Sequence, residues 1–427
     1  MHLPELLSPA GTFEKMTYAF AYGADAVYAG IPRFSLRARE NDFTEQKLEQ
    51  AVRFAHKLGK KIYLTMNIFP HNRKVDSFKE MLSRVARLDM DGLIMADPGM
   101  IGFTRDRYPD IPIHLSTQAN TINYESVRFW QKAGVRRIIL SRELSIEEIA
   151  EIKQRIPEME LETFIHGAIC IAYSGRCLLS NYFNHRDANQ GTCTNACRWE
   201  YNVYKMEDSG DTVLPGHYMI EETERPGSLM PVDEDEHGTY IMNAKDLSTI
   251  GILNRLMDTG IDSLKIEGRT KSVYYLSVVT RAYRSAMDML AAGRPVPREL
   301  QEEVYAVANR GYVTGFLERN PLDNGQNYEQ GHSDNQSRLF VGIVEGWDEG
   351  TGQATIRVRN RLEEGDRLEM ITPEKTVSFL AANMHDLDGT PVQTAHGGGK
   401  NIRLELPQAP GDYALLRKVV AETVEVE

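Results

Sequence analysis

Short apolar runs alternate with longer amphipathic stretches up to about residue 166 of the chain. Apolar runs of roughly four to eight residues are typical of buried parallel strands, and the longer stretches have the period of helices, about 3.6 residues. Eight runs are spaced like βα units, the eighth after a long interruption. The predicted strands are Leu6–Ala10, Asp25–Gly30, Lys61–Asn67, Gly92–Ala96, Pro112–Ser116, Arg137–Ser141, Glu160–His166 and Asp262–Glu267.

Helix signals lie between these runs. Asp76 precedes an apolar stripe at helical spacing, and Ser145 with Glu148 three residues later forms a capping box. The eighth strand leads into a predicted helix over Ser272–Ala292. Eight βα units predict a (β/α)8, TIM-like barrel in residues 1–321. A doubly wound parallel sheet is the alternative.

Two further segments interrupt or follow the barrel pattern. Residues 167–261 form a long insertion between the seventh and eighth strands, and the polar residues 322–336 predict a linker. The alternating strands of residues 337–427 predict a small antiparallel β-barrel domain. Within it, Arg357, Arg359 and Arg361 recur every second residue, which predicts one basic strand face suited to RNA phosphates. A solvated face balanced by neighbouring glutamates is the alternative.

Composition limits the function classes. The chain has 49 Lys and Arg against 61 Asp and Glu, a net charge of −12, so it is no general nucleic-acid coat, although a local basic face can still bind RNA. The first residues lack a basic, apolar leader, and no apolar run is long enough to span a membrane. We therefore expect a cytoplasmic protein with no membrane partner.

All four cysteines lie in one short window of the insertion: Cys170, Cys177, Cys193 and Cys197. In a reducing compartment such a cluster indicates a metal site rather than disulfides. Their spacing suits either a structural zinc ion or a 4Fe–4S cluster.

The cysteines stand within long motifs that resemble the collagenase-like peptidase family of unassigned catalytic type. The resemblance covers essentially the whole chain, including the C-terminal domain. The segments that carry it are Leu7–Gly11, Gly23–Gly30, Glu162–Ser180, Asn181–Asp187, Gly191–Glu200, Asn243–Leu247 and Ser263–Arg269.

The later motifs resemble one branch of that family in particular. The resemblance implies an enzyme that makes 5-hydroxyuridine at the wobble position of tRNA, with prephenate rather than dioxygen as the hydroxyl donor. It also implies a 4Fe–4S cluster on Cys170, Cys177, Cys193 and Cys197, with zinc as the alternative. The expected partners are tRNA, prephenate, and an electron donor or the Fe–S assembly machinery.

Polar residues at the ends of the predicted strands meet at the carboxyl-terminal mouth of such a barrel, where these barrels do their chemistry. Gly268–Ser272 opens a helix, which together with arginine and lysine predicts a site for a carboxylate or a phosphate. The candidate catalytic residues are His166, Glu267 and Arg269. The candidate substrate-binding residues are Asn67, Gln118, Arg142 and Lys271.

Three other functions compete with tRNA hydroxylation. The family name suggests a peptidase, yet the chain has neither a His-Glu-x-x-His zinc motif nor a Gly-x-Ser-x-Gly nucleophile motif. A related branch suggests an oxygen-independent ubiquinone-ring hydroxylation factor. A tRNA-binding scaffold with a structural cluster is the third.

Overall fold

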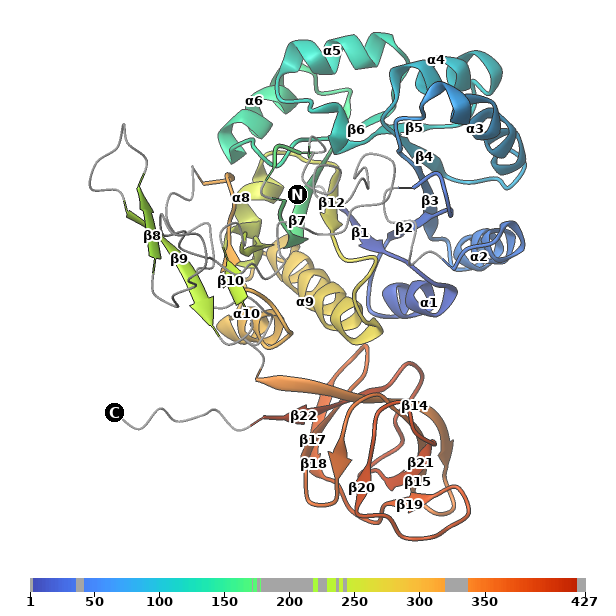
Figure 1. The fold of residues 1–427 in the computed structure, drawn as a ribbon, viewed down its shortest axis with the longest axis vertical. Helices are drawn as coiled ribbons and strands as arrows, with labels where there is room; N and C mark the ends of the chain where they lie inside the picture. Colours follow the sequence, from blue (N-terminus) through green and yellow to red (C-terminus); the bar gives the residue numbers. More distant parts are fainter. Residues whose placement is uncertain are drawn as a thin grey trace, which may run out of the picture.

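The computed structural model describes residues 3–35, 42–170, 172–174, 177, 218–221, 229–235, 238–240, 244–318 and 337–420. Figure 1 shows two parts, a barrel surrounded by helices and a separate all-β domain beside α1 and α9. The predicted linker, residues 322–336, lies outside the described residues, as do Cys193 and Cys197.

Eight parallel strands form the barrel and close it. Strand β12 pairs with β1 on one side, with Glu5 opposite Ser263, and with β7 on the other, with Phe164 opposite Lys265. This closure confirms the predicted (β/α)8 barrel and excludes the open, doubly wound sheet. The strands are β1 (Glu5–Pro9), β2 (Ala26–Gly30), β3 (Lys61–Met66), β4 (Gly92–Met95), β5 (Ile113–Leu115), β6 (Arg137–Ile139), β7 (Glu160–Ala168) and β12 (Ser263–Ile266).

Helices follow the strands around the outside of the barrel (Figure 1). The capping box predicted at Ser145 and Glu148 is present at the start of α6. The start predicted at Asp76 is wrong, because α3 begins one turn earlier, after His71, and buries Phe78 and Leu82. The helices are α1 (Phe13–Ala21), α2 (Glu45–Lys57), α3 (Asn72–Val85), α4 (Pro98–Arg107), α5 (Tyr124–Lys132), α6 (Ile146–Arg155), α8 (Leu253–Asp258), α9 (Val273–Ala291) and α10 (Arg298–Tyr305).

Short elements extend the sheet beside the end of β7. Strand β11 (Asp246–Ser248) pairs antiparallel with β7, and β13 (Tyr312–Val313) pairs with β11. Two single-turn helices, η2 (Thr117–Ala119) and η5 (Ile250–Ile252), follow β5 and β11. Strands β8 (Tyr218–Glu221), β9 (Leu229–Asp235) and β10 (Gly238–Tyr240) form a separate three-stranded antiparallel sheet.

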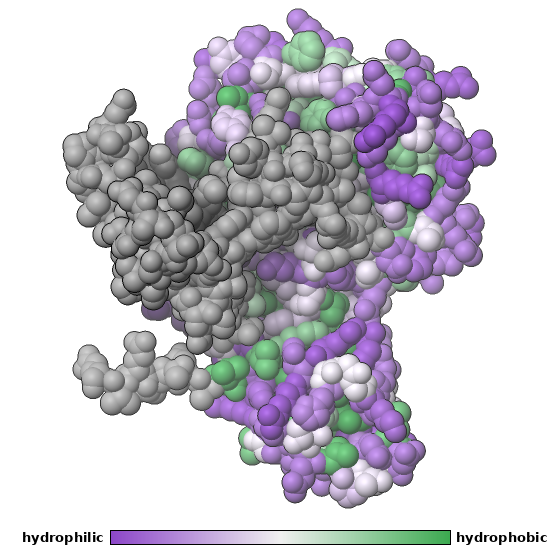
Figure 2. Space-filling view, viewed as in Figure 1, coloured by the Kyte–Doolittle hydropathy of each residue, from purple (hydrophilic) through white to green (hydrophobic). Residues whose placement is uncertain are grey.

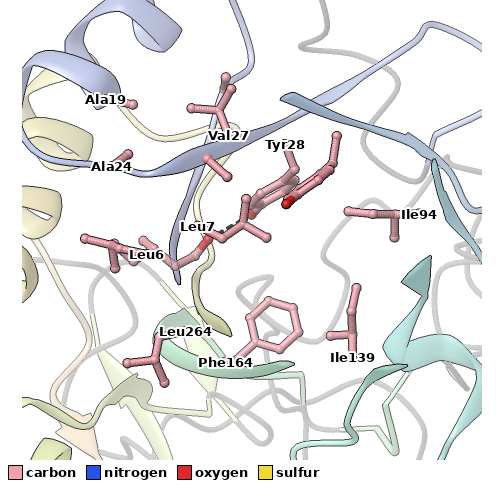
Figure 3. Close-up of a cluster of buried hydrophobic side chains, with 14 of the residues drawn as sticks. Leu6, Leu7, Ala19, Ala24, Val27, Tyr28, Ile94, Ile139, Phe164 and Leu264 are labelled. Carbon is pink, nitrogen blue, oxygen red and sulfur yellow. Dashed lines mark hydrogen bonds between the residues drawn. The ribbon is translucent and has the colours of Figure 1, made fainter. Parts of the chain in front are cut away.

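Apolar side chains fill both sides of the barrel wall. Figure 3 shows Leu7, Ile94, Ile139 and Phe164 converging on the inside of the strands. Residues that alternate with them, such as Leu6 and Leu264, are fully buried on the helix side. The period of two along each strand thus gives the barrel two apolar layers.

Charged groups occupy the rest of the barrel interior. The guanidinium of Arg137 contacts carboxylate oxygens of Glu5 (2.5 Å), Glu160 (3.0 Å) and Glu162 (3.3 Å). The Nζ of Lys265 lies 2.8 Å from Oε1 of Glu162. Burial, with smaller contributions from the charges of Arg269 and Arg137, lowers the pKa of Lys265, and the Glu162 carboxylate opposes that shift. Arg137 and Lys265 therefore each have a carboxylate as a neighbour, as burial of a charge requires.

The C-terminal domain is a seven-stranded antiparallel sheet with the order β18-β17-β22-β14-β15-β21-β19, plus a small β16–β20 pair. It has its own core, which includes Val341, Ile356, Leu404 and Leu416. The predicted antiparallel β-domain is therefore confirmed. Its strands are β14 (Arg338–Asp348), β15 (Gln353–Val358), β16 (Leu362–Glu363), β17 (Arg367–Ile371), β18 (Thr376–Leu380), β19 (His385–Asp386), β20 (Thr394–Ala395), β21 (Ile402–Glu405) and β22 (Leu415–Val419).

A packed interface joins this domain to α1, α9 and α10. The rings of Tyr274 and Phe340 stack with centroids 5.2 Å apart. The guanidinium of Arg417, 3% exposed, contacts Glu303 of α10 (2.8 Å) and Glu369 of β17 (2.6 Å). Burial alone would raise the pKa of Glu303, but hydrogen bonds and charge from Arg417 lower it. The two parts are thus held by a buried ion pair as well as by apolar contact.

The outer surface of the barrel helices is mostly polar, as expected around an apolar core. Figure 2 shows mainly hydrophilic side chains on the barrel helices that face the viewer. Among the described helices, none is long and apolar enough to cross a membrane.

The Arg417 pair gives the first prediction. Replacement of Arg417 by Ala removes two ion pairs from a largely buried interface and leaves Glu303 with Arg281 and Glu369 with Arg338, so we expect a loss of about 3 kcal/mol in the free energy of unfolding. The measurement is urea unfolding followed by fluorescence and circular dichroism. The control is Arg361→Ala, which removes an exposed pair with Glu363 and should cost less than about 1 kcal/mol. Equal losses in the two variants would contradict the assigned role of Arg417.

Candidate functional site at the mouth of the barrel

Arg269 lies across the carboxyl-terminal mouth of the barrel. It follows β12 and is 5% exposed. Its Nη1 donates hydrogen bonds to the hydroxyls of Ser35 (2.8 Å) and Thr65 (2.7 Å), which come from the β2 loop and β3. The guanidinium lies 5.8 Å from the ring centroid of Tyr28. The structure therefore fixes one arginine over the barrel interior, where it could bind an anion.

The backbone before Arg269 explains this placement. Gly268 has φ +146, and a Cβ there would lie 2.7 Å from the ring of Tyr275. A side chain at this position would clash, so glycine allows the sharp exit from β12. Ser272 then caps α9 by accepting a hydrogen bond from the backbone N–H of Tyr275 (3.1 Å). The predicted helix start at this loop is confirmed.

The other two candidates from this loop both contact Tyr275. The Nζ of Lys271 lies 5.3 Å from the ring centroid of Tyr275. Glu267 is half-buried, and its carbonyl accepts a hydrogen bond from the Tyr275 hydroxyl (3.1 Å). Lys271 also acts electrostatically on His166, which lies outside the barrel wall. Lys271 thus lies on the α9 side of the loop, whereas burial, together with the Glu267 carboxylate, raises the pKa of Tyr28 inside the barrel.

A chain of hydrogen bonds holds two further candidates at the mouth. Nδ2 of Asn67 donates to Oγ of Ser116 (3.5 Å), and that hydroxyl donates to Oε1 of Gln118 (3.2 Å). Gln118 is 1% exposed, and its Nε2 has no hydrogen-bond partner among the described residues. The side-chain amide of Gln118 is therefore held in one orientation, and its buried NH2 group can donate to a ligand.

Arg142 lies beside the first cysteine. Its guanidinium stacks 3.9 Å from the ring centroid of Phe164, which points into the barrel. Arg142, Glu143 and Cys170 line a cavity of about 110 Å³. Arg142 thus contacts Phe164 inside the barrel and also lines the cavity beside Cys170.

His166 lies in a cage of tyrosines on the outer side of β7. The Tyr283 hydroxyl donates to the carbonyl of Ile165 (2.9 Å) and accepts from the N–H of Thr249 (3.0 Å). Its hydrogen is therefore used, so Nδ1 of His166, 3.4 Å away, carries the ring proton as donor. Nε2 then accepts from the Tyr312 hydroxyl at 3.3 Å. Neutral imidazole satisfies both contacts.

The strand register explains why His166 does not face the mouth. Lys265 pairs with Phe164, but the next residue, Ile266, pairs with His166, so one extra residue bulges out of β7. Strict alternation would have put His166 inside with Phe164. The bulge instead puts it on the helix side.

Two of the four cysteines fall within the described residues. Cys170 is exposed at the cavity beside Arg142, and Cys177 is half-buried. They are not joined to one another by a disulfide. In the part of the chain that the structure describes, no three His, Cys, Asp or Glu side chains form a metal site.

The three arginines of the C-terminal domain do not form one strand face. Arg357 is on β15 and forms ion pairs with Glu14 and Glu345. Arg359 and Arg361 are exposed and follow the end of the strand at Val358. The prediction of a continuous basic strand face is wrong, because the chain leaves β15 there and turns toward β16.

Three residues that hold the predicted site residues in place were not predicted from the sequence. Ser35 and Thr65, which hold Arg269, and Tyr312, which holds His166, come from distant segments. Thr65 could have been found, because it has the inward period of β3. Tyr312 could not, because its strand has only two residues.

These features define a class of protein: a TIM-like barrel with an arginine at its mouth, a cysteine after its seventh strand and an antiparallel β-domain attached. The model of Peptidase family U32 matches residues 11–327, and that of the Peptidase family U32 C-terminal domain matches residues 336–417. The chain therefore belongs to peptidase family U32.

Its relatives extend over its full length. It is 49% identical to "tRNA hydroxylation protein P" of Escherichia coli (strain K12), over 98% of this chain and 97% of that protein. It is 46% identical to the protein of the same name in Haemophilus influenzae, over 98% and 97%. A solved structure of a U32 peptidase matches with a TM-score of 0.39 and 14% identity, over 64% of this chain and 95% of that chain.

The caged histidine gives the second prediction. Burial, with a smaller contribution from Lys271, lowers the pKa of His166 from 6.5 to about 3. The unfolded chain then binds this proton more readily, so stability is full above about pH 6.5 and falls as the pH drops toward 3. Between pH 7.5 and pH 5 we expect a loss of about 2 kcal/mol from this residue.

The measurement is the free energy of unfolding in urea at both pH values. His166→Gln should remove this part of the pH dependence. His71→Gln, at an exposed histidine, is the control for the loss of one imidazole. An unchanged pH dependence in His166→Gln would show that this imidazole is not held neutral.

Proposed function

We propose that this protein hydroxylates the wobble uridine of tRNA to 5-hydroxyuridine without dioxygen, with prephenate as the hydroxyl donor. The observation that carries the proposal is the full-length similarity to two proteins named for tRNA hydroxylation. The barrel mouth supports it, because a buried arginine and an oriented amide donor suit a carboxylate or a uracil carbonyl.

In this proposal each mouth residue has one task. Arg269 binds a carboxylate of prephenate, and Ser35 and Thr65 hold its guanidinium in place. Gln118 donates from Nε2 to a substrate oxygen, since Ser116 and Asn67 fix its other end. Arg142, stacked on Phe164, adds positive charge beside the cysteines.

The cysteines would hold the cofactor. Cys170 and Cys177, together with Cys193 and Cys197, would be the ligands of a 4Fe–4S cluster, with zinc as the alternative. When bound, such a cluster supplies one-electron transfer. An electron donor or the Fe–S assembly machinery would then be a partner.

His166, Glu267 and Lys271 take supporting roles in this proposal. His166 is buried and neutral, so it holds the end of β7 against α9 rather than giving a proton to substrate. Glu267 and Lys271 flank the exit of β12. Arg269 is the only one of the predicted catalytic residues for which we propose direct substrate contact.

The third prediction tests the function itself. In a deletion strain grown without oxygen, the wild-type gene should restore 5-hydroxyuridine, measured by mass spectrometry of tRNA nucleosides. Arg269→Ala and Cys170→Ser should each lower it at least tenfold, because they remove the anion contact and a cluster ligand. Arg255→Ala, which breaks exposed ion pairs on the barrel surface, is the control. Normal 5-hydroxyuridine in the deletion strain would overturn the proposed function.

Arg359 and Arg361 are proposed contacts to tRNA phosphates, because both are exposed. The fourth prediction is that Arg359→Ala with Arg361→Ala weakens tRNA binding and reduces the slope of log K against log salt by about 1 per arginine. The measurement is filter binding of tRNA at a series of salt concentrations. The control is Arg298→Ala, at an exposed arginine of α10. An unchanged slope would place the tRNA contacts on other residues.

A further inference from the structure

Ser174 lies between the first two cysteines and is 2% exposed. All three of its polar groups are bound to the barrel. Its N–H donates to Oε1 of Glu143 (2.7 Å), and its carbonyl accepts from Nδ2 of Asn120. Its Oγ accepts from the backbone N–H of Arg142 (3.4 Å). Three hydrogen bonds thus hold Ser174 to the barrel.

The residues that hold Ser174 stand on fixed elements. Asn120 follows the short helix η2 and has φ +51, a left-handed conformation that asparagine tolerates better than most residues. Glu143 precedes the capping box of α6 by two residues. Both residues therefore lie next to a helix end, which fixes the backbone from which each side chain reaches Ser174.

The cavity beside Cys170 is part of the same arrangement. It is lined by Arg142, Glu143, Cys170 and Ser174. Oε2 of Glu143 is buried and has no hydrogen-bond partner among the described residues, while Oε1 binds the N–H of Ser174. A carboxylate buried at this expense needs a reason, and its hold on the cysteine segment supplies one.

We propose that Asn120 and Glu143 form a clamp on Ser174 that fixes where Cys170 and Cys177 lie relative to the barrel mouth. Both are positioning residues, because they act through the backbone of Ser174. Any effect of the clamp on a bound cluster rests on the proposed function. Its effect on the position of the two thiols does not depend on that function.

The test uses the full-length protein and four variants. Glu143→Ala removes the acceptor, whereas Glu143→Gln keeps an acceptor oxygen and should rescue. Asn120→Asp has nearly the same shape but places a carboxylate against the Ser174 carbonyl. Glu147→Ala, which removes an exposed ion pair with Arg255 nearby, is the control.

The first readout needs no metal. In reduced, metal-free protein, hydrogen exchange at the Ser174 amide should rise about tenfold in Glu143→Ala, the effect of losing about 1.4 kcal/mol of hydrogen-bond protection. Alkylation of Cys177 by iodoacetamide should rise several-fold in Glu143→Ala and Asn120→Asp. Both values should stay at the wild-type level in Glu143→Gln and Glu147→Ala.

The second readout is the electron paramagnetic resonance spectrum and iron content of protein reconstituted with iron and sulfide. Glu143→Ala and Asn120→Asp should change the spectrum or lower the iron content, and Glu143→Gln should not. Wild-type exchange and alkylation in Glu143→Ala would overturn the clamp. Altered exchange with unchanged Cys177 alkylation would also overturn it, since the clamp would not position the thiols.

Failure of the clamp and failure of the proposed function are separable. If the wild-type protein takes up no iron, the proposed cluster is lost, while the exchange and alkylation data still decide the clamp. If the wild-type protein binds iron and all variants match it in every readout, the clamp is wrong and the cluster stands.

Discussion

The site depends on the pairing of β7 with β12, which closes the barrel. Gly167, near the end of β7, has φ +105, and a Cβ there would lie 2.6 Å from the carbonyl oxygen of Glu267. The two strands therefore leave the barrel in direct contact, which glycine alone permits. One strand continues to Cys170 and the other to Arg269. The closure of the barrel thus brings the cysteine segment and the arginine loop to one side of its mouth.

The charges inside the barrel add a second constraint. Lys265 lies 4.4 Å from the ring centroid of Tyr28, and Arg269 lies 5.8 Å from the same ring, so one aromatic ring faces two cations. Glu162 neutralises the inner cation, Lys265. The outer cation, Arg269, donates hydrogen bonds to the hydroxyls of Ser35 and Thr65. The inside and the mouth of the barrel therefore each hold a fixed cation beside Tyr28, even though the chain is acidic overall.

Much of the fold was predictable because apolar runs mark buried strands whatever their partners are. All eight barrel strands and the antiparallel domain follow from that pattern. What failed depends on single-residue geometry. The bulge at Ile165 turns His166 outward, and the end of β15 at Val358 breaks the series of arginines. Neither the bulge nor the strand end changes the local pattern of apolar and polar residues, so the sequence pattern contains no signal for them.

The site was predictable in the same partial way. Arg269 was found because it follows a strand, but its partners Ser35 and Thr65 come from other strands. Lys271, two residues after Arg269, lies instead against the ring of Tyr275. Position at a strand end therefore selects the residues near a barrel mouth, and only the backbone turn decides which of them faces it.

Helix α9 connects the barrel mouth to the β-domain. Its first turn is capped by Ser272, three residues after Arg269. Further along, Arg281 donates to the carbonyl of Thr372 (2.8 Å), and Tyr274 stacks on Phe340 of the β-domain. One rigid helix therefore sets both the position of Arg269 and the position of the β-domain. Because hydrogen bonds and a stacked ring pair hold α9 to the β-domain, and buried ion pairs hold α10 to it, a nucleic acid held by the β-domain would be presented to the mouth at a fixed distance and not through a flexible tether.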